Sequence, residues 1–162
     1  MRWPDPCPVC ETLKPRSFAA LMELYEQNYL RVRCLFPLMQ DMQGVYVSHA
    51  SGCLRLRVDV LEQSRHTTTL HLSYIMSDNE SRPDVEVRVY HDALQAEILN
   101  CGCSLSKNIY RLSKIRDPET SALLCKWKLN RFLYKWLNYL QRQGHGFAED
   151  RLPQPFKEAV SA

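Results

Sequence analysis

The stretch LRLRVDVLEQSRHTTTLHLSYI, residues 54–75, decides the fold class of this 162-residue chain. Its first part places leucine or valine at every second position from Leu54 to Val60, with arginine or aspartate in between. Its second part collects one face made of Thr68, Leu70, Leu72 and Tyr74. A period of two is typical of strands with one buried face, and β-branched threonines favour strands. We therefore predict two strands, each with one apolar face.

Further strands are predicted on both sides of this stretch. Upstream, a valine-rich segment around residues 45–47 completes a hairpin with the first strand. Downstream, valines alternate with polar residues over 85–89, and a last short strand follows around 96–98. Because the connections are short, antiparallel pairing in a meander is favoured over parallel pairing. The predicted turns lie at Ser51-Gly52, Ser77–Pro83 and His91-Asp92.

One helix is predicted before these strands and one after them. Ser17 is suited to cap a first helix, whose apolar residues recur at helical spacing until Pro37 forbids continuation. Asp117 followed by Pro118 is a typical start for a last helix, which runs to about Gly144. The helical period places Trp127 and Leu137 on its apolar face, so we expect both side chains in the core.

These elements predict an α+β fold, in which an N-terminal and a C-terminal helix pack on one face of an antiparallel sheet of about five strands. The chain divides into an extended cysteine-containing arm (1–16), a single α+β domain (17–144) and a flexible C-terminal tail (145–162). A length of 162 residues is suited to one core.

The composition says more about the cellular compartment of the protein than about its function. No apolar run approaches the roughly 20 residues that span a bilayer, and the first residues lack the apolar segment of a secretory signal, so we expect a cytoplasmic protein without membrane contact. Seven cysteines, an odd number, then indicate reduced thiols or a metal rather than disulfides. A net charge of +3 is too small to indicate a nucleic-acid partner by itself.

Three strings resemble the YqiB-like family of uncharacterised bacterial proteins, a domain of unknown function. They are SRHTTTL (64–70), VRVYHDALQAEI (87–98) and KLNRFLYKWLNYLQRQG (128–144), and the resemblance covers about residues 18–147. It implies a bacterial, cytosolic protein, and it carries over no activity, cofactor or catalytic residue. The arm with Cys7 and Cys10 departs from the family pattern, so no metal site there is inherited.

A polar cluster lies within the matched strings and is the candidate site: Arg65, His66, Tyr90, His91, Asp92 and Glu97. A histidine beside a carboxylate is suited to proton transfer, because its ordinary pKa of about 6.5 lies near working pH. Adjacent strand residues point to opposite faces, however, so the histidine and aspartate of the turn need not cooperate. A purely structural network, with an ion pair between Arg65 and Glu97, explains the same residues.

Two functions of different class follow from this cluster. The leading hypothesis is a non-enzymatic accessory domain that binds a small ligand or a protein. The competing hypothesis is a hydrolase-like or other acid-base enzyme that uses His91 with Asp92 or Glu97. The enzyme requires those side chains within hydrogen-bond reach of one another in an open cleft.

A basic stripe on the last helix is a further feature, formed by Lys128, Arg131, Lys135 and Arg142 at spacings of three, four and seven. Such stripes are usually solvated faces, and the core claims most of the neighbouring aromatic residues. A nucleic-acid-associated protein is therefore a further alternative that the sequence does not favour.

Two cysteine pairs form a candidate zinc site: Cys7, Cys10, Cys101 and Cys103. Four thiolates can hold zinc tetrahedrally if the arm folds back onto the end of the last strand, and the metal would then order a segment that has little packing of its own. The first pair has the usual spacing of zinc knuckles, whereas the second has one intervening residue fewer. The alternative is that these are incidental thiols.

We predict from this pattern that the full chain, purified without a histidine tag, contains one zinc ion per molecule by elemental analysis. The sulfur–metal distances should be about 2.3 Å. The double variant Cys7→Ser/Cys10→Ser should lose the metal, because two ligands are removed. Equal zinc in the wild type and the double variant would exclude the site.

Overall fold

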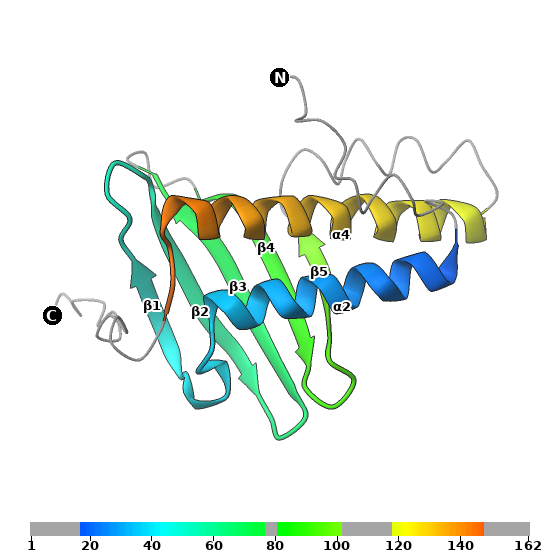
Figure 1. Cartoon of the computed structure of the whole chain (residues 1–162), viewed down its shortest axis with the longest axis horizontal. Helices are drawn as coiled ribbons and strands as arrows, with labels where there is room; N and C mark the ends of the chain where they lie inside the picture. The colour runs from blue at the N-terminus through cyan, green and yellow to red at the C-terminus, as the bar shows by residue number, and fades with distance from the viewer. Residues whose placement is uncertain (1–16, 77–80, 102–117, 148–162) are drawn as a thin grey trace, which may run out of the picture.

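The computed structural model describes residues 17–76, 81–101 and 118–147. A helix α2 (Phe18–Leu35) and a short 3-10 helix η1 (Met39–Asp41) precede five strands, and a long helix α4 (Pro118–Gln143) follows them. The strands are β1 (Gly44–Ser48), β2 (Arg55–Gln63), β3 (Thr67–Ile75), β4 (Ser81–Tyr90) and β5 (Gln95–Cys101). They pair antiparallel in sequence order, and both helices lie across the same face of the sheet (Figure 1). The predicted α+β fold is confirmed.

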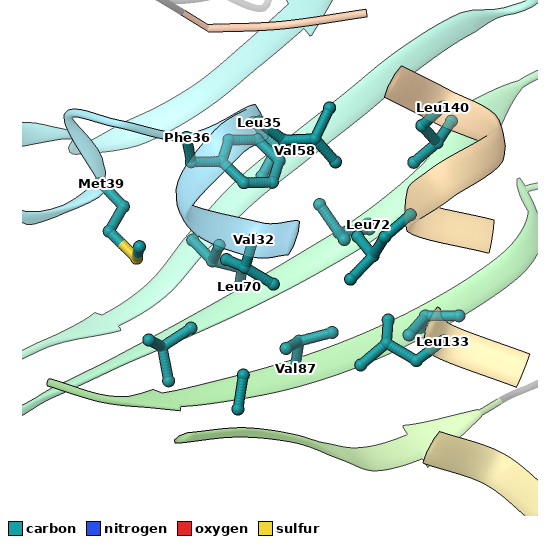
Figure 2. Close-up of a cluster of buried hydrophobic side chains, with 14 of the residues drawn as sticks. Val32, Leu35, Phe36, Met39, Val58, Leu70, Leu72, Val87, Leu133 and Leu140 are labelled. Atoms are coloured by element: carbon teal, nitrogen blue, oxygen red, sulfur yellow. The ribbon is translucent and has the colours of Figure 1, made fainter. Parts of the chain in front are cut away.

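The face under the helices holds the main core. Alternate residues of the three central strands point toward the helices and are fully buried, as Val58, Leu70 and Val87 illustrate. Helix α2 adds Val32 and Leu35, and helix α4 adds its own leucines from the other side (Figure 2). Burying a side chain of this size is worth about 1.5–3 kcal/mol, so the shared face is the dominant stabilising feature.

A second apolar cluster joins the two helices near the N-terminus of α2. Trp127 of α4 is only 2% exposed and packs in the cluster that contains Leu21, Leu24 and Tyr25 of α2. Leu137 lies in the main core and is fully buried. The prediction that Trp127 and Leu137 are core residues is therefore confirmed.

Helix ends are fixed by local hydrogen bonds that the sequence indicated. The Ser17 side chain accepts a hydrogen bond from the Ala20 N–H at 3.3 Å, which caps α2. At the other end of the domain, Gly144 has φ +92°, and the N–H of His145 donates to the Leu140 carbonyl at 3.1 Å. With the Gly144–Gln141 bond, this is a Schellman motif, in which only glycine takes the left-handed position easily.

The segment after α4 returns to the domain and does not leave it at residue 145. The Phe147 N–H donates to the Leu35 carbonyl at 2.9 Å, and the Phe147 ring stacks on Phe36 with centroids 4.8 Å apart. The His145 side chain is buried against the Ser48 hydroxyl, 3.1 Å from Nδ1. The predicted tail thus begins with three packed residues. Its remainder and the arm (1–16) lie outside the described residues.

A buried polar network joins both helices to the edge strand β5. The Asn130 side chain accepts a hydrogen bond from the Ile98 N–H at 3.0 Å and donates to the Lys126 carbonyl at 2.8 Å. The Asn28 amide of α2 donates to the Asn130 carbonyl at 3.2 Å. Both asparagines are fully buried, where each unmet hydrogen bond costs about 1–3 kcal/mol. The network therefore fixes how the helices sit over β5.

One strand starts earlier than its sequence indicates. The polar stretch Ser77–Pro83 predicts a turn, but β4 begins at Ser81 and includes Pro83. Proline lacks the N–H of a regular ladder, and the pairing of β3 with β4 shifts between Ser73 and Ile75, opposite this part of β4. An irregularity of this kind is where a strand accommodates proline.

We predict that Trp127→Ala lowers the free energy of unfolding by about 3–5 kcal/mol, because it leaves a cavity between the helices. Tyr139→Ala on the same helix is the matched control, since Tyr139 is 55% exposed and should lose little on truncation. Urea unfolding of both variants and the wild type measures the difference. Equal midpoints for Trp127→Ala and the wild type would contradict the observed packing.

Candidate functional site

Two turns come together at one end of the sheet and bring four of the predicted site residues into one region. The β2–β3 turn carries Arg65 and His66, and the β4–β5 turn carries His91 and Asp92. The N–H of His91 donates to the His66 carbonyl at 2.9 Å, which holds the turns together. Leu94 in the second turn has φ +54° and an exposed side chain, a strained conformation for a residue other than glycine.

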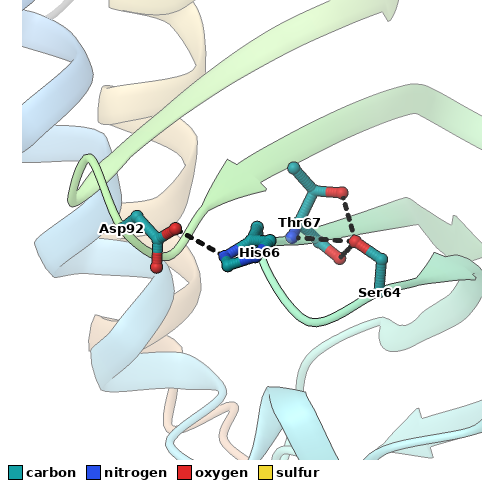
Figure 3. A network of polar contacts seen from close by, with 4 residues as sticks. All are labelled: Ser64, His66, Thr67 and Asp92. Carbon is teal, nitrogen blue, oxygen red and sulfur yellow. Dashed lines mark hydrogen bonds and ion pairs between the residues drawn. The ribbon is translucent and has the colours of Figure 1, made fainter.

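His66 and Asp92 form the pair at the tip of these turns. The Nδ1 of His66 lies 2.5 Å from the Asp92 Oδ2. The two side chains point toward each other between the turns (Figure 3). Both side chains are largely in solvent, with exposed fractions of 58% and 73%. Ser64, the nearby hydroxyl, is engaged with Thr67, whose hydroxyl oxygen lies 2.8 Å away. The arrangement therefore contains a histidine oriented by a carboxylate but lacks a nucleophile bonded to that histidine.

His91 points to the opposite side, toward the helices. Its Nε2 lies 2.7 Å from the Thr68 hydroxyl, which in turn donates to Gln63 Oε1 at 3.1 Å. The Gln63 amide donates to the Met39 carbonyl at 3.2 Å, so this chain of bonds ties the turn to η1. Burial lowers the pKa of His91, and the positive charge of Arg33 lowers it further. His91 is therefore held as a neutral, structural donor to Thr68.

Tyr90 and Glu97 lie on the face of the sheet opposite the main core, which we call the open face. The two helices pack on the other face, although Tyr25 of α2 reaches Glu97 at the β5 edge. The Tyr90 hydroxyl donates to Glu97 Oε1 at 2.6 Å. Burial and this carboxylate raise the pKa of Tyr90, and Arg88 beside it acts in the opposite direction. Tyr25 of α2 lies near the same carboxylate, and its pKa is raised first by burial and then by the charge of Glu97.

Arg88 completes this group and was missed by sequence reasoning. It stands directly across from Glu97 in the β4–β5 register, yet its Nε donates to the Thr69 hydroxyl at 3.4 Å. Period-two alternation alone places Arg88 on the polar face, but the register that sets it beside Thr69 and Glu97 depends on strand pairing. His71 and Asp84 form another pair on the open face, which no sequence pattern predicts.

Five of the six predicted site residues thus separate into three places instead of one pocket. His66 and Asp92 pair in solvent, His91 faces the helices, and Tyr90 with Glu97 lies on the open face. The predicted Arg65–Glu97 ion pair is wrong, because no such pair forms within the described part of the chain. Arg65 is exposed in the β2–β3 turn, whereas Glu97 accepts from Tyr90. Alternation of side chains across the strands separates residues that are adjacent in sequence.

The zinc hypothesis concerns residues that the structure largely leaves out. Cys7, Cys10 and Cys103 lie outside the described residues, and Cys101 ends β5 with a side chain that is not described. Among the residues that are described, no three His, Cys, Asp or Glu side chains gather as metal ligands. The four-cysteine site therefore stays a prediction.

The described helices also bear on the predicted surface features. None of them is long and apolar enough to cross a membrane. In the basic stripe of α4, Arg142 is exposed and the other three cations are half-buried. Trp127, Tyr134 and Trp136 are all buried, so the large aromatic residues beside the stripe serve the core.

Comparison with known proteins agrees with the resemblance seen in the sequence. A family described as "Protein of unknown function (DUF1249)" matches residues 31–146. "Uncharacterized protein YqiB" of Escherichia coli K12 is 33% identical over 133 residues, which cover 79% of this chain and 91% of that protein. The proteins of the same name from strains O6:H1 and O157:H7 give the same values. No solved structure gives a significant match.

The burial of His91 predicts a loss of stability in mild acid. Its pKa is lowered in the folded state, so between about pH 7.5 and pH 5 the unfolded chain binds the proton more readily, and the free energy of unfolding falls. His91→Gln keeps an amide N–H for Thr68 but does not titrate. The free energy of unfolding of this variant should therefore fall less over this pH interval than that of the wild type. His145, whose pKa burial also lowers, leaves a residual slope.

Urea unfolding at both pH values, with His91→Gln/His145→Asn as a second variant, measures the effect. Asparagine retains a polar atom near the position of Nδ1, which faces Ser48. The double variant should be the least sensitive to pH. An equal loss of stability in the wild type and both variants would show that these imidazoles do not resist protonation.

Proposed function

The chain belongs to the family described as a protein of unknown function (DUF1249), and we propose that it is a non-enzymatic accessory domain that binds a protein partner on the open face of its sheet. We expect this domain to bind its partner in the cytosol, the compartment that the sequence predicts. The proposal depends mainly on one observation, which is the environment of Arg88.

Arg88 is half-buried on the open face and makes no ion pair in the described part of the chain. Its Nε donates to Thr69, and its side chain also has a hydrogen bond with Tyr90, so these contacts use only part of the five N–H donors of the guanidinium. The other donors can bond an acceptor outside the domain. Tyr90 lies beside it, fixed by its bond to Glu97. Arginine and tyrosine are enriched in protein interfaces and at their energetic hot spots, where a pre-fixed side chain loses little entropy on binding.

The chemistry of the open face favours a protein over a small molecule. Sites for small molecules are concave and mostly apolar, with few polar groups. The open face instead presents a row of polar side chains across three neighbouring strands, in the register Thr69–Arg88–Glu97, beside the pair of His71 with Asp84. A surface of alternating charge on a rigid sheet is suited to a partner of complementary pattern.

The contacts of the histidines support a binding role over the enzyme. The acid-base hypothesis requires His91 to act with Asp92 or Glu97, but His91 donates to Thr68 on the helix side. Asp92 orients His66 instead, and this pair stands in solvent, where an ionic interaction is screened. The hydroxyl beside His91 is that of Thr68, which is fully buried and donates its proton to Gln63, so a substrate cannot reach it.

The test compares the full chain with Arg88→Ala and Tyr90→Phe as baits for proteins of the source cell, followed by binding measurements with each purified candidate. Arg142→Ala is the matched control, because Arg142 is an exposed arginine of α4, on the helix side of the sheet and away from the open face. Thermal melts of all variants establish that they fold.

The expected result is one partner whose purified form binds the wild type and the control equally and binds Arg88→Ala about tenfold or more weakly. Tyr90→Phe should weaken binding less, since it removes only the hydroxyl that fixes the ring. Equal binding of the wild type and Arg88→Ala would refute the proposed surface. A turnover that Asp92→Asn abolishes would refute the non-enzymatic assignment.

A further inference from the structure

The three residues after α4, 145–147, form a segment that we call the strap. It leaves α4 at the left-handed Gly144 and runs beside β1 (Figure 1). The Phe147 N–H bonds the carbonyl of Leu35, one of the end groups that α2 cannot satisfy by itself. The stacked rings of Phe147 and Phe36 are both fully buried. The strap thus connects the end of α4 to the end of α2.

The second attachment of the strap is the His145 ring, which is only 4% exposed. Its Nδ1 lies 3.1 Å from the hydroxyl oxygen of Ser48, to which the Gly146 N–H also donates at 3.4 Å. Its Nε2 is buried and makes no hydrogen bond of normal geometry. A neutral imidazole has one N–H donor, whereas the protonated ring has two. Protonation therefore puts a charged ring in a buried position where its Nε2–H lacks a well-placed acceptor.

The surroundings of the ring do not offset this charge. The strap touches the ends of α2 and α4, strand β1 and the turn before β2. In these parts, the residues within three positions of a contact that carry charge in mild acid are all basic: Arg33, His49, Arg55, Arg57 and Arg142. Burial lowers the pKa of His145 most, the Leu54 backbone raises it, and the charge of His49 lowers it again. A ring released into water escapes the burial, so a proton favours the open strap.

We infer that the strap is acid-sensitive: protonation of His145 releases residues 145–147 from β1 and α2, while the sheet and both helices stay folded. The strap bonds a side-chain hydroxyl of β1 and an end carbonyl of α2, so its release breaks no bond within a strand pair. Gly144 is the hinge, and the release uncovers the Phe36 ring. Local opening of such a segment requires less free energy than global unfolding. The inference does not depend on the proposed binding by the open face.

Hydrogen exchange of single amides, measured by NMR on the full chain at pH 7.5 and pH 5, tests this inference. Each rate is expressed as a protection factor relative to an unstructured peptide at the same pH. The Phe147 amide reports the strap, and the Leu72 amide reports global unfolding, because β3 lies between two other strands. We expect Phe147 to be less protected than Leu72 at both pH values. Protection at Phe147 should fall about tenfold from pH 7.5 to pH 5, since the ordinary pKa of histidine, about 6.5, lies between them.

His145→Asn should remove this fall, because asparagine keeps a polar atom near Ser48 but does not titrate. His91→Gln is the matched control: it removes the other histidine whose pKa burial lowers, and it should leave the fall at Phe147 unchanged. Equal protection at Phe147 and Leu72 would mean that the strap opens only by global unfolding, which overturns the inference. Protection at Phe147 that does not fall in the wild type, or that falls equally in His145→Asn, overturns it too.

Discussion

The apolar face of the meander must be covered, and this constraint organises the rest of the structure. Strands β2 to β4 each turn a row of branched aliphatic side chains to the same side, and these side chains are fully buried. The chain offers two amphipathic helices, one before the strands and one after them, and both are needed because one helix is narrower than the sheet. The helices consequently lie side by side on one face and leave the other to polar groups.

Covering one face creates the difference between the two sides of the domain. On the helix side, polar groups make structural hydrogen bonds. Asn130 bonds the β5 backbone, and His91 connects a turn to η1 through Thr68. On the open side, the cross-strand neighbours Arg88 and Glu97 are only half-buried and make contacts with hydroxyl groups. The same alternation that builds the core therefore supplies the surface that we propose for binding.

The segment after α4 shows how a short local motif affects distant elements. The left-handed Gly144 reverses the chain so that Phe147 reaches Phe36 and its N–H bonds the end of α2. This closure places His145 over β1, where it contacts the Ser48 hydroxyl. The segment that follows α4 is thus anchored on the helix side of the sheet.

Local chemistry made much of the fold predictable. The period of two over residues 54–75, the cap at Ser17 and the stop at Gly144 each depend on neighbours within a few residues, and each is found in the structure. The start of β4 at Ser81 was not predictable in this way, because an irregularity in pairing with β3 lets a proline-containing segment join the sheet.

The site depended on information of another kind. Sequence alone determined which residue types lie in the strands and turns. It also determined that one face of the sheet is buried, because side chains alternate between the two faces of any extended strand. Only the tertiary structure decided that His66 meets Asp92, that His91 meets Thr68 and that Glu97 meets Tyr90 rather than Arg65. The reason is that register between strands and packing of helices depend on residues far apart in the chain, whose mutual positions no local pattern records.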